Sequence, residues 1–328
     1  MPAPRQHLLL VNLGTPQEAT AESVRTFLRE FLSDPAVVDL PRWLWLPILE
    51  KMVLRSRPQR VAEAYGSIWT EGGSPLRVAT ERMVMAVRAR ANGTFTVSSA
   101  YRYGEPSLHA EMHRLAHEHD GPVTVVPLFP QRTDATTTTA FQRAREAAAD
   151  AGIAHRYREA LVAPADDGYI AALASRWQEA LDAAEVPPEH LVISFHGIPV
   201  RYNRREGSQY TRDCQETSEA FLNSIRWPQA KATLAYQSKF GPEPWLKPGT
   251  AAVLEQLARR GVRRVAVVTP GFLTHGLETL EEIGIRGHED FIAAGGEQLV
   301  LVGTIEDHPH MIESLVRLAE SEHPSARR

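Results

Sequence analysis

The amino-acid sequence predicts an α/β protein with two doubly wound domains, each built on a parallel sheet. Its 328 residues are enough for about two domains. Short apolar segments alternate with segments of helical periodicity, and several apolar segments lack the alternating polar residues of a half-exposed strand. Such strands are typical of parallel sheets with helices on both faces. A change in composition near residues 162–165 places the boundary between domains 1–164 and 165–328.

The first domain begins with an apolar segment followed by an amphipathic one. Val24, Phe27, Leu28 and Phe31 recur at the spacing of one helix face. Segments rich in Val and Thr, bounded by turn residues, predict later strands. The predicted strands are 7–12, 94–100 and 123–128, and the predicted helices are 22–32, 107–118 and 138–150.

The second domain has the same alternation of strand and helix segments, without a sequence repeat. Its predicted strands are 191–195, 232–236, 265–268 and 298–302, and its predicted helices are 168–184, 211–225, 249–260, 278–294 and 308–320. We expect the last helix to pack back on the first domain.

Composition excludes several classes of protein. The net charge of −4 lacks the basic excess of nucleic-acid-binding proteins, so no nucleic-acid partner is expected. The single cysteine, Cys214, cannot form an internal disulfide, a Cys-based zinc site or an iron–sulfur cluster, and it indicates a reducing, cytoplasmic setting. Neither the dinucleotide fingerprint nor the P-loop motif occurs, so no nucleotide cofactor is expected.

The apolar segment 43–49 has two interpretations. It contains two tryptophans and is flanked by Arg42 and Lys51, but it is far shorter than the roughly 20 residues that span a bilayer. It is either an interfacial, lip-like surface or the buried start of a helix, and the sequence leaves both open.

The candidate chemistry lies beyond the ends of two predicted strands, where open α/β sheets bind ligands. Strand 191–195 leads directly into His196, and strand 265–268 leads to Glu278 in the first turn of the next helix. An imidazole and a carboxylate in one cleft would suit transient binding of a divalent transition metal. The alternatives are a histidine bonded to backbone and a carboxylate that complements the helix dipole.

A second group of histidines recurs every four residues at His109, His113 and His117. The zinc motif H-E-x-x-H requires Glu directly after the first histidine, and Ala110 occupies that position. We therefore interpret these histidines as a solvated helix face.

A series of segments, taken in order, resembles the ferrochelatases of bacteria, enzymes that insert ferrous iron into a porphyrin. The segments are LLLVNLGTP (8–16), FLSDPAVVDLPRWLW (31–45), IWTEGGSPL (68–76), YRYGEPS (101–107), PLFPQ (127–131), SFHGIP (194–199), YQSKFGPEPWLKP (236–248) and PGFLTHGLETLEEI (270–283). The resemblance implies two Rossmann-like domains with a porphyrin cleft between them. It also implies Fe2+ as a substrate, no iron–sulfur cluster, and His196 and Glu278 as the catalytic, iron-binding pair.

The resemblance further implies contacts with the porphyrin. Ser74 and either Arg55 or Arg57 resemble family contacts to the propionates. Leu13 and Tyr236 resemble positions beside the macrocycle, and Leu13 offers no side-chain oxygen as a ligand. The segment 43–49 resembles the lip over the cleft, with peripheral membrane contact as its consequence. The oligomeric state stays open, with a monomer favoured.

The chain departs from the family pattern near the carboxylate. His275 and Gly276 stand where relatives have an acidic residue followed by Cys or His, which implies a second imidazole near the metal. Glu282 fits the four-residue spacing of acidic groups in relatives, whereas Arg286 takes the next position and is expected to pair with Glu282.

The implied reaction is insertion of Fe2+ into protoporphyrin IX to form protohaem, with release of two protons. A neutral imidazole with a pKa of about 6.5 can accept those protons, so we expect His196 to be the acceptor. Glu278 would strip water from iron or relay charge outward. Two alternatives stay open: a chelatase for another tetrapyrrole or metal, such as coproporphyrin or cobalt, and a non-catalytic haem-binding carrier.

Overall fold

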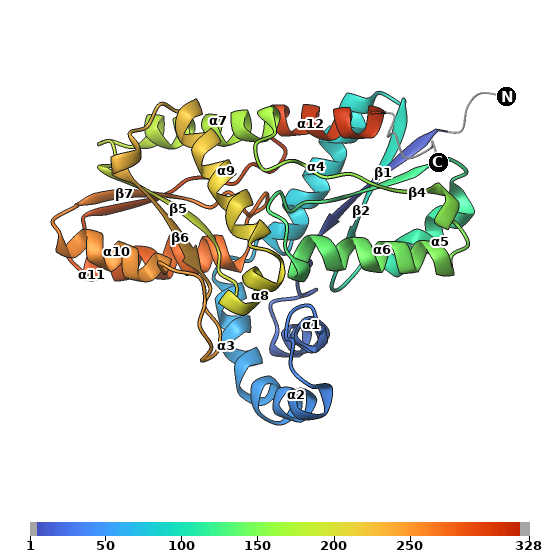
Figure 1. The fold of residues 1–328 in the computed structure, drawn as a ribbon, viewed down its shortest axis with the longest axis horizontal. Coiled ribbons are helices and arrows are strands. Elements are labelled where there is room, and N and C mark those ends of the chain that lie inside the picture. The colour runs from blue at the N-terminus through green and yellow to red at the C-terminus, as the bar shows by residue number, and fades with distance from the viewer. Residues whose placement is uncertain (1–4, 322–328) are drawn as a thin grey trace.

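The computed structural model describes residues 5–321 and contains two four-stranded parallel sheets side by side (Figure 1). Residues 1–4 and 322–328, the outer ends of the two predicted domains, lie outside the described residues. The first sheet has the order β2-β1-β3-β4 and consists of β1 (Gln6–Asn12), β2 (Phe95–Tyr101), β3 (Val123–Pro127) and β4 (Tyr157–Glu159). The second has the order β6-β5-β7-β8 and consists of β5 (His190–His196), β6 (Ala232–Gln237), β7 (Arg264–Val268) and β8 (Gln298–Leu301). The α/β prediction is confirmed.

Both sheets are doubly wound, because successive residues of their strands face different layers of helices. In β1, Leu8 and Leu10 belong to one buried cluster, and Leu9 and Val11 belong to another. Every one of these side chains is fully buried, which explains the uninterrupted apolar segment. The helices of the layers are α4 (Pro75–Ala91), α5 (Leu108–Glu118), α6 (Thr139–Asp150), α7 (Asp167–Ala183), α8 (Val200–Arg205), α9 (Gln209–Ser224), α10 (Thr250–Arg259), α11 (His288–Ala293) and α12 (Pro309–Glu320).

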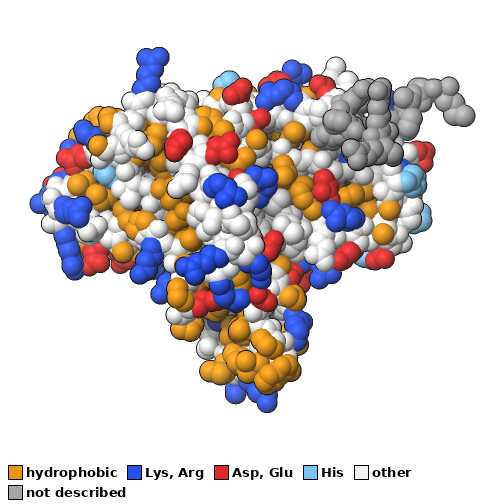
Figure 2. Space-filling model, in the orientation of Figure 1, with side chains coloured by type: hydrophobic (Ala, Val, Ile, Leu, Met, Phe, Trp, Pro, Cys, Tyr) orange, Lys and Arg blue, Asp and Glu red, His pale blue; other side chains and the backbone are white. Residues whose placement is uncertain are grey.

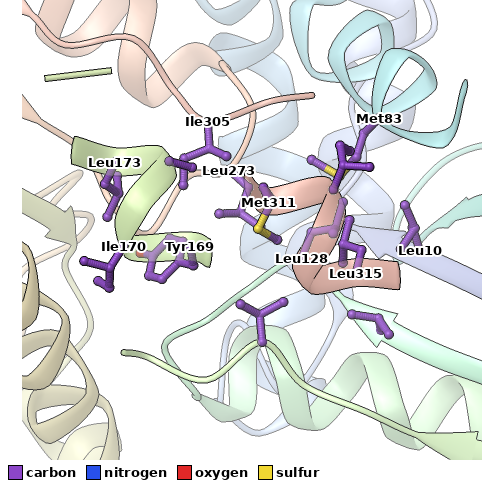
Figure 3. Packing of buried hydrophobic residues seen from close by; sticks show 14 of the residues in the cluster. Leu10, Met83, Leu128, Tyr169, Ile170, Leu173, Leu273, Ile305, Met311 and Leu315 are labelled. Atoms are coloured by element: carbon purple, nitrogen blue, oxygen red, sulfur yellow. The ribbon is translucent and has the colours of Figure 1, made fainter. Parts of the chain in front are cut away.

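We call the two halves the N-terminal lobe, around β1–β4, and the C-terminal lobe, around β5–β8. A single hydrophobic cluster joins them (Figure 3). Met311 and Leu315 of α12 lie in this cluster between Met83 of the N-terminal lobe and Leu173 of α7. The last helix thus packs on elements of both halves, and the boundary at residues 164 and 165 stays a prediction.

A helical projection extends from the N-terminal lobe (Figure 1). It consists of α1 (Ala21–Ser33), α2 (Arg42–Ile48), the π-helical turn η1 (Leu49–Val53) and α3 (Leu54–Gly66). The segment 43–49 combines both of its interpretations, because Trp43 is 79% exposed whereas Trp45 and Leu49 are buried. The indole Nε1 of Trp45 donates to the carbonyl oxygen of Leu32 at 2.6 Å, which anchors α2 on α1.

The projection also contacts the C-terminal lobe through α8. The Asp39 carboxylate accepts hydrogen bonds from Arg201 and Arg205 at 3.0 and 2.7 Å. The backbone N–H of Asp39 donates to the Tyr202 hydroxyl at 2.8 Å. Since α8 begins four residues after His196, this contact ties the projection to the end of β5.

Candidate active site

His196 is the last residue of β5 and lies half-buried at the carboxyl edge of the C-terminal sheet. Its Nδ1 lies 2.6 Å from the carbonyl oxygen of Gly197. A carbonyl oxygen only accepts, so Nδ1 carries the proton and the neutral imidazole keeps an unprotonated Nε2. That nitrogen can bind a metal ion or accept a proton. The rings of Trp245 and Phe272 flank the imidazole at centroid distances of 6.5 and 6.3 Å.

Glu278 lies in the first turn of the π-helix η5 (Leu277–Gly287). Its side chain folds back over Gly276, where an added Cβ would lie 3.2 Å from Oε2. Burial raises the pKa of the Glu278 carboxyl, and the nearby His196 opposes that rise. A carboxyl with a raised pKa holds a proton closer to neutral pH and can exchange it there.

The structure brings these two predicted residues together. The strand order reverses between β5 and β7, and doubly wound sheets bind ligands at such a switch point. His196 ends β5, the loop after β7 leads to Glu278, and Gln237, which pairs with His196 in the sheet, donates to the Glu278 carbonyl oxygen at 2.6 Å. Their catalytic roles stay a prediction.

The N-terminal lobe supplies the facing side of this junction. Leu13, which follows β1, packs in one apolar cluster with Tyr65 of α3 and Leu277 of η5. Burial raises the pKa of the Tyr65 phenol, the charge of Glu278 adds to that rise, and a hydrogen bond with Thr15 opposes it. Tyr65 was not among the residues predicted for the site, although Leu54, Pro58, Ala62 and Tyr65 repeat at helical spacing and are all buried.

Ser74 occupies the position before the first turn of α4 and is buried. The Thr15 hydroxyl donates to the Ser74 hydroxyl at 2.8 Å, which links the segment after β1 to the start of α4. Gly14 is required here, because its φ is +110° and a Cβ would lie 1.8 Å from the carbonyl oxygen of Tyr103.

Arg57 lies on α3 and reaches the C-terminal lobe. Its guanidinium carbon lies 4.4 Å from the ring centroid of Phe240, in the loop after β6. The Arg57 Nε atom is buried without a hydrogen-bond partner, and burial lowers the pKa of the guanidinium. Arg55, the alternative left open by the sequence, is exposed.

Tyr236 lies on the other face of the sheet from His196. It pairs in register with Phe195, and both rings lie in the buried cluster shared by the lobes. The Tyr236 side chain is only 8% exposed, and burial raises the pKa of its phenol. Successive side chains of a strand point to opposite faces of the sheet. Since Gln237 lies on the same face as His196, Tyr236 must lie on the other face. We therefore do not retain Tyr236 as a porphyrin contact.

His275 does not form the expected second imidazole at the metal. Its Nδ1 contacts the Thr279 hydroxyl at 3.0 Å, and its Nε2 accepts from the backbone N–H of Thr304 at 3.5 Å. Burial, together with Arg176 and Arg82, lowers the pKa of His275 to about 4. Both ring nitrogens are engaged, so this histidine is a neutral structural group.

The expected pair of Arg286 and Glu282 is wrong. Arg286 binds Glu281 instead, with Nε and Nη2 each 3.1 Å from a carboxylate oxygen. The reason is the π-helix, in which hydrogen bonds connect residues five apart rather than four. Glu282 accepts from the N–H and the hydroxyl of Ser238 at 2.8 and 2.5 Å.

The other histidine group lies on α5. His109 and His117 are exposed, and the rings of His109 and His113 lie 4.4 Å apart. Within residues 5–321, no group of three or more His, Cys, Asp or Glu side chains is arranged to hold a metal ion. None of the helices in the same residues has the length and apolar composition needed to cross a membrane.

The chain is similar to known ferrochelatases over nearly its whole length. The ferrochelatase family model matches residues 5–323. The ferrochelatase of Pectobacterium atrosepticum is 39% identical over 320 residues, which is 95% of this chain and 96% of the relative. The ferrochelatase of Bordetella pertussis is 40% identical over 323 residues, which is 96% and 88% of the two chains.

Solved structures show the same architecture at low sequence identity. The sirohydrochlorin chelatase SirB from Bacillus subtilis subspecies spizizenii, solved in complex with cobalt, superposes with a TM-score of 0.56 at 13% identity. The alignment covers 98% of each chain, and at this identity the likeness concerns the fold alone. From the family match and the curated relatives, the chain belongs to the ferrochelatase family, lyase-class metal chelatases that insert ferrous iron into a porphyrin during haem biosynthesis.

Proposed function

We propose that this chain is a protoporphyrin ferrochelatase. It inserts Fe2+ into protoporphyrin IX, releases two protons and forms protohaem, the last step of haem biosynthesis. The observation that supports this most is that His196, whose Nδ1 is bonded to Gly197, and Glu278 lie on segments joined by Gln237 at the switch point of the C-terminal sheet. Fe2+ is a substrate here, and the reaction needs no nucleotide and no iron–sulfur cluster.

In the proposed reaction, two pyrrole N–H bonds break as four N–Fe bonds form. The Nε2 of His196 takes a pyrrole proton, because the bond from Nδ1 to Gly197 keeps Nε2 free of its own proton. Glu278 replaces water on the incoming iron and passes protons outward, for which a raised pKa is suited. Imidazole and carboxylate both bind divalent transition metals. Because His196 and Glu278 supply only two ligands, they hold the ion loosely and only during its transfer.

The proposed porphyrin site places the macrocycle between the C-terminal pair and the N-terminal wall of Leu13 and Tyr65. Their apolar cluster suits the face of a flat macrocycle. The propionates would point to Ser74 and Arg57. Ser74 directly precedes a 17-residue helix whose N-terminus favours anions, and Arg57 adds a positive charge.

An anaerobic insertion assay tests the substrate. Protoporphyrin IX and coproporphyrin III are offered separately with Fe2+, and the formed haem is read from its absorbance spectrum. We expect kcat/KM for protoporphyrin to exceed that for coproporphyrin. A higher value for coproporphyrin would assign the chain to the other substrate, and tight binding of haem without turnover would make it a carrier.

We further propose that the tip of the projection contacts a membrane surface. Hydrophobic side chains gather there beside basic ones (Figure 2). Trp43, Leu44 and Met52 are 79%, 42% and 66% exposed, and Lys51 and Arg42 lie next to them in the chain. Such amphipathic surfaces bind anionic lipid surfaces without spanning them.

Vesicle sedimentation tests the membrane proposal. We expect the chain to pellet with vesicles containing anionic phosphatidylglycerol and less with neutral phosphatidylcholine vesicles. Trp43→Ser should lower binding to both, whereas Met85→Ser, which alters an exposed residue of α4, should not. Equal binding by the parent chain and the Trp43→Ser chain would contradict the proposal.

A further inference from the structure

Behind the candidate active site lies a buried network of three polar side chains. Ser194, Gln237 and Thr250 are 0%, 3% and 2% exposed. The Ser194 hydroxyl donates to Oε1 of Gln237 at 2.6 Å and lies 2.7 Å from the Thr250 hydroxyl. Burying such groups is unfavourable unless each finds a partner, so the network holds a defined geometry.

Gln237 is the member that reaches the catalytic pair. Its side-chain Nε2 donates to the backbone carbonyl oxygen of Glu278 at 2.6 Å. Its own backbone carbonyl oxygen accepts from the N–H of Gly197 at 2.8 Å. Gly197 also provides the carbonyl oxygen that orients the His196 ring. One residue thus binds the segments that carry both His196 and Glu278.

This bridge lies beside a second link between the same segments, the two hydrogen bonds from Ser238 to Glu282, and it is the one of the two that ends on Glu278 itself. Gln237 pairs in register with His196 on neighbouring strands, so the position of its backbone is set by the sheet. The amide side chain extends from that fixed point to the first turn of η5. The hydrogen bond therefore fixes the backbone of Glu278 relative to the strand end beside His196, whereas the Ser238 bonds hold η5 one turn further on, at Glu282.

From these contacts we infer that Gln237 is a positioning residue that sets the separation between His196 and Glu278. The inference rests on the proposed function, since it gives both residues a role in metal insertion. Gln237 acts through backbone groups and Ser194, and it does not touch the reacting atoms. Its loss changes the placement of Glu278, and a misplacement of about 1 Å lowers catalysis about 10²-fold.

The first test compares Gln237→Met with Gln131→Met. Gln131 is the matched control, because it is equally buried and its Nε2 makes two side-chain hydrogen bonds, to Tyr169 and Thr217. In anaerobic Zn2+ and Fe2+ insertion, we expect kcat per folded enzyme to fall about 10²-fold in Gln237→Met. We expect KM for porphyrin to change less than about threefold, and Gln131→Met to keep kcat within that factor. Equal kcat values for the two variants would overturn the inference.

The second test uses the pH profile of Gln237→Glu. A protonated carboxyl supplies a donor for the Glu278 carbonyl and an acceptor for Ser194, whereas an ionised carboxylate has no proton to donate. We expect the ratio of its kcat to that of the parent to rise as pH falls, while the ratio for Gln237→Met stays flat. A ratio for Gln237→Glu that does not rise would contradict the positioning role.

The proposed function and the positioning role of Gln237 can fail separately. If His196→Ala and Glu278→Gln both keep parental turnover, the proposed function is wrong. If they lose turnover while Gln237→Met behaves like Gln131→Met, only the positioning role of Gln237 is wrong.

Discussion

The two lobes have the same topology and different chemistry. Relative to its own first strand, each sheet has the order 2-1-3-4, with the reversal beside that strand. The first strand of the N-terminal sheet ends at Asn12, and the first strand of the C-terminal sheet ends at His196. The Asn12 amide donates to the Thr80 and Thr274 hydroxyls at 2.9 and 3.1 Å, so it joins elements, whereas His196 presents a ring nitrogen to the junction.

This difference shows what topology decides and what it leaves to side chains. Both switch points are suitable places for a ligand. The N-terminal one is followed by the helical projection, which contributes apolar groups and carries Arg57, the arginine that we propose for the propionates. The C-terminal one is followed by a histidine and a carboxyl whose pKa is raised. We therefore propose that the N-terminal lobe holds the porphyrin and that the C-terminal lobe transfers the protons and the metal.

The largest expected effect concerns His196 and Asn12, the residues that end the first strand of each sheet. His196→Ala removes the proposed proton acceptor, and such groups contribute about 10²–10⁴-fold to rate. We expect insertion to fall by that factor, while porphyrin binding, followed by fluorescence quenching, is kept. Asn12→Ala should lower stability by removing two hydrogen bonds, with less than about a tenfold loss of kcat per folded enzyme. Comparable losses of kcat in both variants would contradict the proposal that proton and metal transfer belongs to the C-terminal lobe alone.

Each lobe contains a buried histidine whose lowered pKa makes the stability of the fold depend on acid pH. His275 titrates at about 4 when folded, and His7, bonded to Thr96 and Ser98, titrates at about 3, because burial lowers both pKa values. As pH falls below the unfolded pKa of about 6.5, the unfolded chain binds protons first, so stability is full above that pH and is lost toward pH 4.

The His275 contribution is about 3 kcal/mol in the limit of full titration, and that of His7 is larger. We expect His275→Asn and His7→Asn each to flatten the acid limb of a urea-unfolding series between pH 7 and 4.5. An acid limb of parental slope in both variants would show that neither buried histidine controls it.

The proposed binding of porphyrin by the N-terminal lobe is tested at two of its arginines, Arg57 and Arg55. Arg57→Ala should raise KM for porphyrin about tenfold with kcat unchanged, as expected for one lost hydrogen bond to a charged group. Arg55→Ala is the control, because that exposed side chain lies two residues away, and its KM should be parental. A larger rise in Arg55→Ala would transfer the role to Arg55.

The smallest effect concerns the stability of the C-terminal lobe. The pKa of Glu278 is raised in the folded state, so the folded chain binds the proton more tightly and stability falls as pH rises through the unfolded and then the folded pKa. Glu278→Gln should therefore raise Tm by about 2 °C at pH 8 and by nothing measurable at pH 4. A Tm at pH 8 below that of the parent would show that Glu278 stabilises the fold.

The sheets were predictable from the sequence, and most side-chain partners were not. The seven predicted strands agree with the structure to within one residue at each end, because their uninterrupted apolar character follows from burial on both faces. The three-residue strand β4 was missed, since Tyr157–Glu159 is partly exposed and too short to carry a pattern. The positions of His196 and Glu278 beyond two strands followed from the general rule for α/β sheets.

Other features required three-dimensional contacts. Helices α2–α4 have proline within or at the start of the helix, at Pro47, Pro58 and Pro75, which obscures the helical pattern in the sequence. The π-helix changes the neighbour of Arg286 from Glu282 to Glu281, and no propensity indicates it. Gln237 lies within a motif recognised by resemblance, but its bridge to Glu278 depends on how β6 and η5 pack.

The most direct measurement is a crystal structure of the chain with metal-free protoporphyrin IX bound. The account predicts the macrocycle between His196 and the wall of Leu13 and Tyr65, with a pyrrole nitrogen about 3 Å, or one water molecule, from Nε2 of His196. Its propionates should lie at Ser74 or Arg57. A macrocycle bound elsewhere, or one whose nitrogens are out of reach of His196 and Glu278, would contradict the assignment of proton and metal transfer to the C-terminal lobe.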